Sequence, residues 1–365
     1  MINRELIAKL GQQLKADGVS ALMVAPSPDM MFLVGNSPYL CERFQALFVK
    51  DDGTLFYVCN ALSVDETTEF MEGARIYGWP DGANFGLTVK QAFEDHGLVG
   101  KKIAINSGVR AFNLIQIMEC VDFTPVNGKS YLEQTRIIKT PEELENLRKS
   151  ALLIDKVFEE VIKLIRPGMT ERDVKNEIAR ICKELGGKDC SGGIVAINAN
   201  AAMPHYSGDS AVIGEHAVVV MDMGCTVGGM NSDTTRTVFV GKATEREKYL
   251  YNLVLQANLA GEAAAVNGAY IPDVDAAARK VIEAAGFGKE FNHRLGHGIG
   301  YAGHEAPYIQ AGNDLYLAPG MAFSCEPGIY IKDEIGIRIE DVVIINEHGE
   351  REVLNKSSKE LIEIL

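Results

Sequence analysis

The sequence predicts an α/β protein of two domains. Three observations lead to this prediction: 365 residues exceed the usual size of one domain, short apolar runs alternate with helical patterns, and one order of elements occurs twice in the later part of the chain. With 47% hydrophobic residues, the chain has enough apolar surface for a core in each domain. We expect the first domain to span residues 1–130 and the second to span residues 136–365.

The first domain is expected to form a small α/β unit that starts with an amphipathic helix, because leucines recur at every fourth position in residues 6–14. Two β-type runs, residues 44–50 and 54–59, flank an Asp-Asp-Gly sequence that is typical of a hairpin turn. The remaining patterns predict strands at 20–25, 101–106 and 121–126, with helices near 88–97 and 110–119.

The second domain is expected to begin with two helices and a β-rich stretch, and then to repeat this order. Thr140, Pro141 and the two glutamates that follow form a typical helix start. The four helices are predicted at residues 140–165, 170–185, 244–266 and 273–285. The repetition suggests two pseudo-twofold duplicated halves, although the halves share few residues, so the duplication is a hypothesis.

Charge and composition exclude several classes of function. The net charge of −14 and a pI near 5.1 argue against nucleic acid or an anionic membrane as the main partner. The apolar runs are strand-sized, too short for a transmembrane helix, and the charged start lacks the apolar region of a signal peptide. Seven cysteines without a CxxC pair indicate reduced core thiols, so we expect a cytoplasmic protein.

The most informative feature is a set of acidic residues in or beside apolar runs. Asp222 follows Ala-Val-Val-Val-Met, and Asp233 comes eleven positions later. Glu326 and Glu340 form a second pair, and His297 stands between two glycines. A buried carboxylate is costly unless it is paired or bound to metal, and several together repel one another. Four carboxylates and one imidazole are the ligand set expected for two divalent cations.

Simpler interpretations were weighed for each residue. Either aspartate alone is better explained as a loop cap, so the metal prediction rests on the whole set. Arg338 shares one strand face with Glu340 and is predicted to hold a ligating carboxylate, which is compatible with a structural salt bridge. A GxGxxG match at residues 298–303 is rejected as a dinucleotide site, because no clear strand precedes it. The oxygen-rich ligand set favours Mn²⁺ or Co²⁺, with Fe²⁺ and Zn²⁺ as alternatives.

The ordered motifs resemble one family of metallopeptidases. HY, SDTTRT, GHGIG, HEAP, EPGIY and RIEDVV, with the five candidate ligands at these spacings, resemble the creatinase/prolidase/aminopeptidase P group, family M24. The resemblance implies a pita-bread α+β catalytic domain in the second part of the chain, a creatinase-type N-terminal α/β domain in the first, and a homodimer. It implies that one metal is bound by Asp222, the other by His297 and Glu326, and both by bridging Asp233 and Glu340.

The same resemblance implies hydrolysis of the amide bond between an N-terminal residue and proline, by an Xaa-Pro aminopeptidase or dipeptidase. Two metals would activate a water molecule and polarise the scissile carbonyl. Glu326 would take the proton of that water, and His205 and His304 would stabilise the tetrahedral oxyanion. His293 would line the pocket for proline, with Arg338 as a further substrate-binding candidate.

Tyr308 is a third substrate-binding candidate, and here the chain departs from the family pattern. It follows HEAP, where many Xaa-Pro dipeptidases have an arginine that binds the free carboxylate of the dipeptide. This departure leaves longer Xaa-Pro peptides open as substrates. The alternatives are non-peptide chemistry on the same fold, by a creatinase-type hydrolase or a metal-dependent lyase, and a non-catalytic binding protein. The intact ligands and histidines count against the creatinase-type and non-catalytic alternatives.

Overall fold

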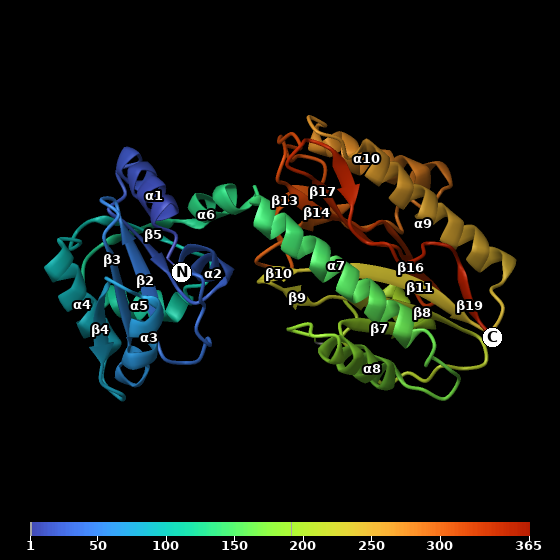
Figure 1. The fold of residues 1–365 in the computed structure, drawn as a ribbon, viewed down its shortest axis with the longest axis horizontal. Helices are drawn as coiled ribbons and strands as arrows, with labels where there is room; N and C mark the ends of the chain where they lie inside the picture. Colours follow the sequence, from blue (N-terminus) through green and yellow to red (C-terminus); the bar gives the residue numbers. More distant parts are fainter. Residues whose placement is uncertain (1, 191) are drawn as a thin grey trace. The chain divides into compact units, whose positions relative to one another are not determined.

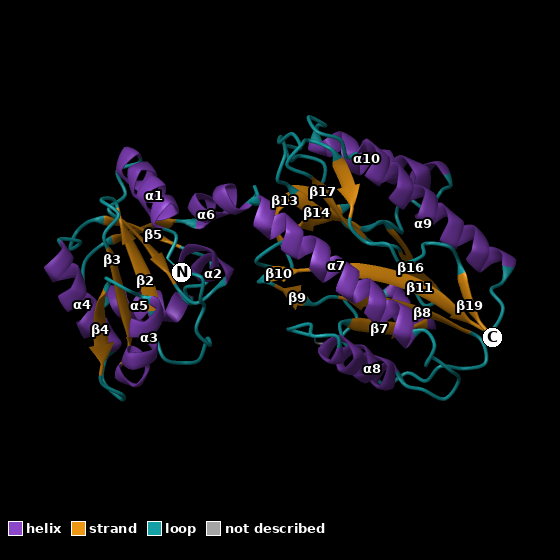
Figure 2. Cartoon of the chain, in the orientation of Figure 1, coloured by secondary structure: helices purple, strands orange, loops and turns teal. Residues whose placement is uncertain are grey.

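The computed structural model describes residues 2–190 and 192–365, and the chain divides into two compact units, Met1–Arg136 and Ile137–Leu365. Each unit combines helices with β-sheets, as Figures 1 and 2 show. The predicted two-domain α/β organisation is therefore confirmed. No helix among the described residues is long and apolar enough to cross a membrane.

The first unit is built on a six-stranded sheet with the order β4-β3-β2-β1-β5-β6. The predicted hairpin is confirmed, because β2 and β3 pair antiparallel across the Asp-Asp-Gly turn. β1 pairs antiparallel with β2 and parallel with β5, so the sheet is mixed. The strands are β1 (Ala21–Val24), β2 (Ala46–Lys50), β3 (Leu55–Asn60), β4 (Arg75–Trp79), β5 (Lys102–Ile105) and β6 (Thr124–Asn127).

Helices cover both faces of this sheet. Along β1, Leu22 and Val24 pack into a core with α1, α2 and α6, whereas Ala21 and Met23 pack into a second core with α4 and α5. Burial on both faces explains why the strands read as continuous apolar runs. The helices are α1 (Arg4–Ala16), α2 (Pro28–Val34), α3 (Val64–Phe70), α4 (Phe85–His96), α5 (Ala111–Met118) and α6 (Lys129–Arg136).

The second unit contains the four predicted long helices. Three of them begin with a capping box, in which a threonine hydroxyl and an acidic side chain three residues later satisfy each other's backbone N–H groups. These caps fix the helix starts that the sequence predicted. The helices are α7 (Pro141–Val161), α8 (Glu171–Glu184), α9 (Glu245–Ala264) and α10 (Ile271–Ala284).

Two larger sheets carry the rest of this unit, with the orders β19-β11-β8-β7 and β13-β12-β14-β17-β18. α7 and α8 share a core with the first sheet, and α9 and α10 share a core with the second. The strands of the first sheet are β7 (Ile194–Ile197), β8 (Ala217–Met223), β11 (Thr234–Val240) and β19 (Ile362–Ile364). Those of the second are β12 (Gly296–Gly298), β13 (Glu305–Ile309), β14 (Ala322–Cys325), β17 (Asp341–Ile345) and β18 (Arg351–Val353).

Two short hairpins complete the unit and correct one prediction. They pair β9 (Thr226–Val227) with β10 (Met230–Asn231), and β15 (Gly328–Ile331) with β16 (Ile335–Arg338). The apolar run 337–343 was interpreted as one strand, but it is divided between β16 and β17, which belong to different sheets. Glu340 lies at the crossing between them, immediately before β17.

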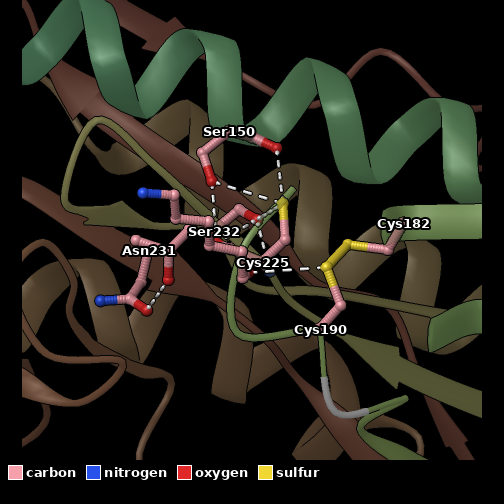
Figure 3. Close-up of a disulfide and its surroundings, with 8 residues drawn as sticks. Ser150, Cys182, Cys190, Cys225, Asn231 and Ser232 are labelled. Carbon is pink, nitrogen blue, oxygen red and sulfur yellow. Dashed lines mark hydrogen bonds between the residues drawn. A yellow bond between two sulfur atoms is a disulfide. The ribbon is translucent and has the colours of Figure 1, made fainter. Parts of the chain in front are cut away.

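A disulfide contradicts the prediction that all the cysteines are reduced. Cys182, in α8, is bonded to Cys190, and Figure 3 shows this bridge beside Cys225. The two cysteines are eight residues apart and match no common cysteine motif, so this bridge was not predictable from their spacing. Cys225 and Cys325 are buried free thiols, as expected for the reduced core thiols that the cysteine pattern indicated. Burial raises the pKa of the Cys225 thiol, whose sulfur contacts the hydroxyls of Ser150 and Ser232.

A buried ion pair anchors the start of the second unit to the segment that follows His304. Lys139 Nζ lies 2.5 Å from Glu305 Oε1, and both side chains are 1% exposed. Glu305 also accepts a hydrogen bond from the backbone N–H of Ala302, so its carboxylate holds both sides of this loop. Neither charge has access to water, so each depends on the other.

We therefore expect Lys139→Met to destabilise the protein by about 3–5 kcal/mol, because the variant leaves the Glu305 carboxylate buried without its ammonium partner. The free energy of unfolding, measured by urea denaturation, tests this. Lys149→Met is the matched control: its pairing with Glu145 is exposed, with side chains 56% and 53% accessible, and should contribute only about 0–1 kcal/mol. Equal losses in the two variants would contradict the role given to the buried pair.

Candidate metal centre and active site

One cavity of about 920 Å³ gathers the predicted site residues. All of them line it except Tyr308, which lies outside the described lining. The lining residues that the sequence predicted are His205, Asp222, Asp233, His293, His297, His304, Glu326, Arg338 and Glu340. The lining also contains residues that the sequence analysis did not single out, among them Arg294 and Gln310.

Strand ends bring the four acids together. In the first sheet, Asp222 lies next to the end of β8 and Asp233 immediately precedes β11, its antiparallel partner. In the second sheet, Glu326 follows β14 and Glu340 precedes β17, and these strands also pair antiparallel. Each sheet thus presents two carboxylates at the end of one strand pair.

The carboxylates form overlapping groups with His297. Oxygens of Asp222, Asp233 and Glu340 all lie within 4.8 Å of one another, and so do ligand atoms of His297, Glu326 and Glu340. Glu340 is common to both groups. Asp233 forms a third such group with His297 and His304, so it too lies between the two sides of the site.

The orientation of His297 suits a metal ligand. Its Nδ1 lies 3.1 Å from the carbonyl oxygen of Gly298, which only accepts hydrogen bonds, so Nδ1 carries the proton. Its Nε2 lone pair then faces Glu326 Oε1 at 3.3 Å and Asp233 Oδ2 at 3.7 Å. Burial lowers the pKa of His297 to about 3, so the ring is neutral at neutral pH. A lone pair facing carboxylate oxygens is the arrangement expected of ligands that share a cation.

The pKa values of the acids also indicate a cation-binding site. Burial, followed by the charge of the neighbouring acids, raises the pKa of Asp233 and of Glu340 well above the ordinary values. Burial likewise raises the pKa of Glu326 to about 7. Glu340 Oε1 is buried and accepts no hydrogen bond from the described residues. These observations fit divalent cations, which would neutralise the acids and occupy the open oxygen.

Arg338 and Thr235 hold the acids in place. Arg338 Nη2 donates to Asp222 Oδ2 at 2.7 Å, and its Nε donates to Thr235 Oγ1 at 2.9 Å. The Thr235 hydroxyl in turn donates to Glu340 Oε2 at 2.7 Å. Arg338 thus contacts the carboxylate of the first acid pair directly and that of the second through Thr235. The sequence analysis did not predict a role for Thr235, although it lies within the SDTTRT motif.

The three candidate histidines occupy different environments in the cavity. His304 and His205 are exposed, and the ring of His304 stacks on that of His297 with centroids 3.7 Å apart. His293 is held at both nitrogens, with Nδ1 2.7 Å from the Arg294 carbonyl oxygen and Nε2 3.1 Å from the Tyr330 hydroxyl. Burial lowers its pKa to about 4, so His293 offers a neutral, fixed ring.

Arg294 lines the cavity and Tyr330 contacts two of its lining residues, and neither role was predicted from the sequence. The Tyr330 hydroxyl lies between His293 and Arg338, at 3.1 Å from each partner atom, and so links the two. The Arg294 guanidinium lies over the ring of Tyr308, with its Cζ 4.4 Å from the ring centroid. Tyr308 therefore contacts the cavity lining through Arg294. The available signals were the EPGIY motif for Tyr330 and adjacency to His293 for Arg294.

Comparison with known proteins identifies the family. Residues 145–347 match the model described as Metallopeptidase family M24, and residues 7–138 match the Creatinase/Prolidase N-terminal domain. The chain belongs to metallopeptidase family M24. The predicted family and its pita-bread architecture are thereby confirmed, and members of this M24 family use divalent metal ions.

Similar proteins match nearly the whole chain. A probable dipeptidase PepE of Mycobacterium bovis is 35% identical over 343 residues, which cover 93% of this chain and 90% of that protein. A recombinant prolidase from Thermococcus sibiricus superposes with a TM-score of 0.94 at 31% identity, covering 100% of this chain and 99% of the other. Dipeptidase PepE from Mycobacterium ulcerans superposes with a TM-score of 0.90 at 32% identity, covering 99% and 97%.

Metal is expected to stabilise the M24 protein more at about pH 7.5 than at about pH 5. Without metal, the Glu326 pKa is about 7 in the folded protein instead of 4.5, so this carboxyl contributes stability that is complete below its ordinary pKa and is lost as the pH rises through the folded value. A divalent cation removes the penalty of the ionised acids, whereas at lower pH it must displace protons. The rise in Tm when Mn²⁺ is added to chelator-treated protein measures the effect.

Asp233→Asn serves as the control for this experiment, because it removes one charged ligand and should reduce the rise in Tm at both pH values. A rise that is equal or smaller at the higher pH would contradict the assignment of the raised carboxyl pKa values to the metal centre.

Proposed function

We propose that this protein is a dinuclear-metal peptidase that hydrolyses the amide bond between an N-terminal residue and proline. The observation that carries the proposal is the pair of overlapping ligand groups that share Glu340 within one cavity. The relatives named dipeptidase and prolidase support the peptide substrate. They do not favour the creatinase-type hydrolase, the lyase or the non-catalytic binding protein considered from the sequence.

In this proposal, one cation is held by Asp222 and the other by His297 and Glu326, while Asp233 and Glu340 bridge both. The neutral Nε2 of His297 and the open oxygen of Glu340 support this division. Because four ligands are carboxylates and one is an imidazole, Mn²⁺ or Co²⁺ is favoured, with Fe²⁺ and Zn²⁺ as alternatives. When bound, two divalent cations acidify a water molecule and polarise the scissile carbonyl.

The side chains around the centre then have separate tasks. Glu326 accepts the proton of the attacking water, for which its place in the cavity beside His297 suits it. His304 and His205, exposed on two different loops, donate hydrogen bonds to the carbonyl oxygen as it gains negative charge. Arg338 holds Asp222 and, through Thr235, Glu340, so that the carboxylates keep their positions during the reaction.

The proline of the substrate is assigned to the part of the cavity beside His293. Because Tyr330 and the Arg294 carbonyl oxygen fix this ring at both nitrogens, it presents a rigid flat surface to an apolar, ring-shaped residue. The partner of the enzyme in this proposal is thus a peptide with proline at the second position. A homodimer and a cytoplasmic location remain predictions from the sequence. The cytoplasmic location was inferred from reduced cysteines, and the Cys182–Cys190 disulfide removes that support.

The metal-loaded protein is expected to cleave Xaa-Pro dipeptides, Xaa-Pro-Yaa peptides or both, and to cleave Xaa-Ala peptides more slowly. Chelator-treated protein should be reloaded separately with Mn²⁺, Co²⁺ and Zn²⁺, and the released N-terminal residue should be quantified. Bound metal without turnover of any Xaa-Pro substrate would exclude the proposed activity.

Asp233→Asn should lower kcat/KM by more than about 100-fold, since even residues that only support metal ligands contribute 10–100-fold. The substitution keeps the shape of the side chain and removes its charge. Metal content per chain, measured by mass spectrometry, should fall in parallel. Arg172→Gln, at an exposed arginine paired with Asp209, is the control and should leave both quantities unchanged. Full activity of Asp233→Asn would show that the metal centre is misassigned.

A further inference from the structure

The charges in the cavity determine how it can bind the free carboxylate of a dipeptide substrate. Four of its lining residues are the acids of the metal centre. A dipeptide also carries a free carboxylate, one residue beyond the bond to be cleaved. Two divalent cations would balance the charge of the four acids and leave no positive charge for this carboxylate, so its binding in the cavity requires a cationic side chain.

Two arginines line the described part of the cavity, and one of them, Arg338, is already hydrogen-bonded to other groups of the chain. Arg338 is 4% exposed and uses all three guanidinium nitrogens on other groups of the chain. Its hydrogen bonds run to Asp222 Oδ2, Thr235 Oγ1, the Tyr330 hydroxyl and, at 3.4 Å, the Pro204 carbonyl oxygen. These contacts use four of its five N–H donors, and its charge is paired with Asp222, so Arg338 is poorly suited to bind a further carboxylate.

Arg294, in contrast, has a guanidinium that is available to a ligand. Its guanidinium makes no hydrogen bond or ion pair with the described residues, and it lies half-buried in the cavity lining over the Tyr308 ring. It also directly follows His293, the residue assigned to the proline pocket. We propose that Arg294 binds the free carboxylate of a Xaa-Pro dipeptide; this inference rests on the proposed peptidase function.

The chemistry of the pair supports this role. A guanidinium matches a carboxylate with two parallel N–H donors, and an aromatic face limits the rotation of the arginine without consuming a donor. Tyr308 occupies the position at which the sequence lacks the arginine of many Xaa-Pro dipeptidases. In this chain the cation therefore comes from a different segment, and the residue at position 308 supplies the surface on which it rests.

The test compares Ala-Pro with Ala-Pro-amide, in which the carboxylate is replaced by a neutral group, using the Mn²⁺-loaded full-length protein. Arg294→Gln should lower kcat/KM for Ala-Pro about 10- to 100-fold, mainly by raising KM, as expected for a lost charge-assisted hydrogen bond. Its kcat/KM for Ala-Pro-amide should change by less than about threefold. Arg294→Lys keeps the charge and should lie between Arg294→Gln and the unmodified protein on Ala-Pro.

Arg180→Gln is the matched control, because this arginine lies on the exposed side of α8 and pairs with Glu177 and Glu184; it should leave both substrates unaffected. Equal losses on the two substrates, no loss on either, or a lysine variant no better than the glutamine variant would overturn the role of Arg294. Turnover by the unmodified protein separates these outcomes from failure of the proposed function, in which neither substrate is cleaved.

Discussion

Mutual repulsion among four carboxylates in one cavity is the constraint on which the rest of the catalytic unit depends. Burial, together with the charge of neighbouring acids, raises the pKa of Asp233, Glu326 and Glu340, so the fold holds these acids close together and away from water. The fold opposes the repulsion with fixed donors. Arg338 and Thr235 restrain two of the acids, and the Ser324 hydroxyl donates to Glu326 at 3.2 Å. A site arranged in this way is completed by cations.

The arrangement of the strands explains how the four acids come together without long loops. Each comes from or beside the end of an antiparallel strand pair: Asp222 is the penultimate residue of β8, and the other three acids directly precede or follow their strands. The break between β16 and β17 matters most, because it lets Arg338 stay in one sheet while Glu340 begins the approach to another.

The ligand set was predictable from the sequence because acidic residues are rare in buried strands. Asp222, for example, directly follows an apolar run that is typical of a buried strand. The capped starts of α7 and α8 were also predictable, since in each a threonine stands shortly before acidic residues, with a proline between them in α7. The disulfide, Tyr330 and Arg294 were not predictable in this way. Their roles depend on partners outside their own local motifs, such as Arg338 for Tyr330 and Tyr308 for Arg294. Spacing in one sequence carries no information about such contacts.

The relation between Arg294 and Tyr308 shows why a missing motif residue is weak evidence for a lost function. A site that binds a carboxylate needs a cationic side chain at a given position in space, and this side chain can come from any of the neighbouring segments. Replacing an arginine by tyrosine removes a cation from one segment, but it also creates an aromatic surface that suits a guanidinium from the other. Because the charge of Arg338 is paired with Asp222, the charge at Arg294 is the one that the described cavity lining leaves for a ligand. The departure from the family pattern at position 308 is thus better read as a relocation of the cation than as its loss.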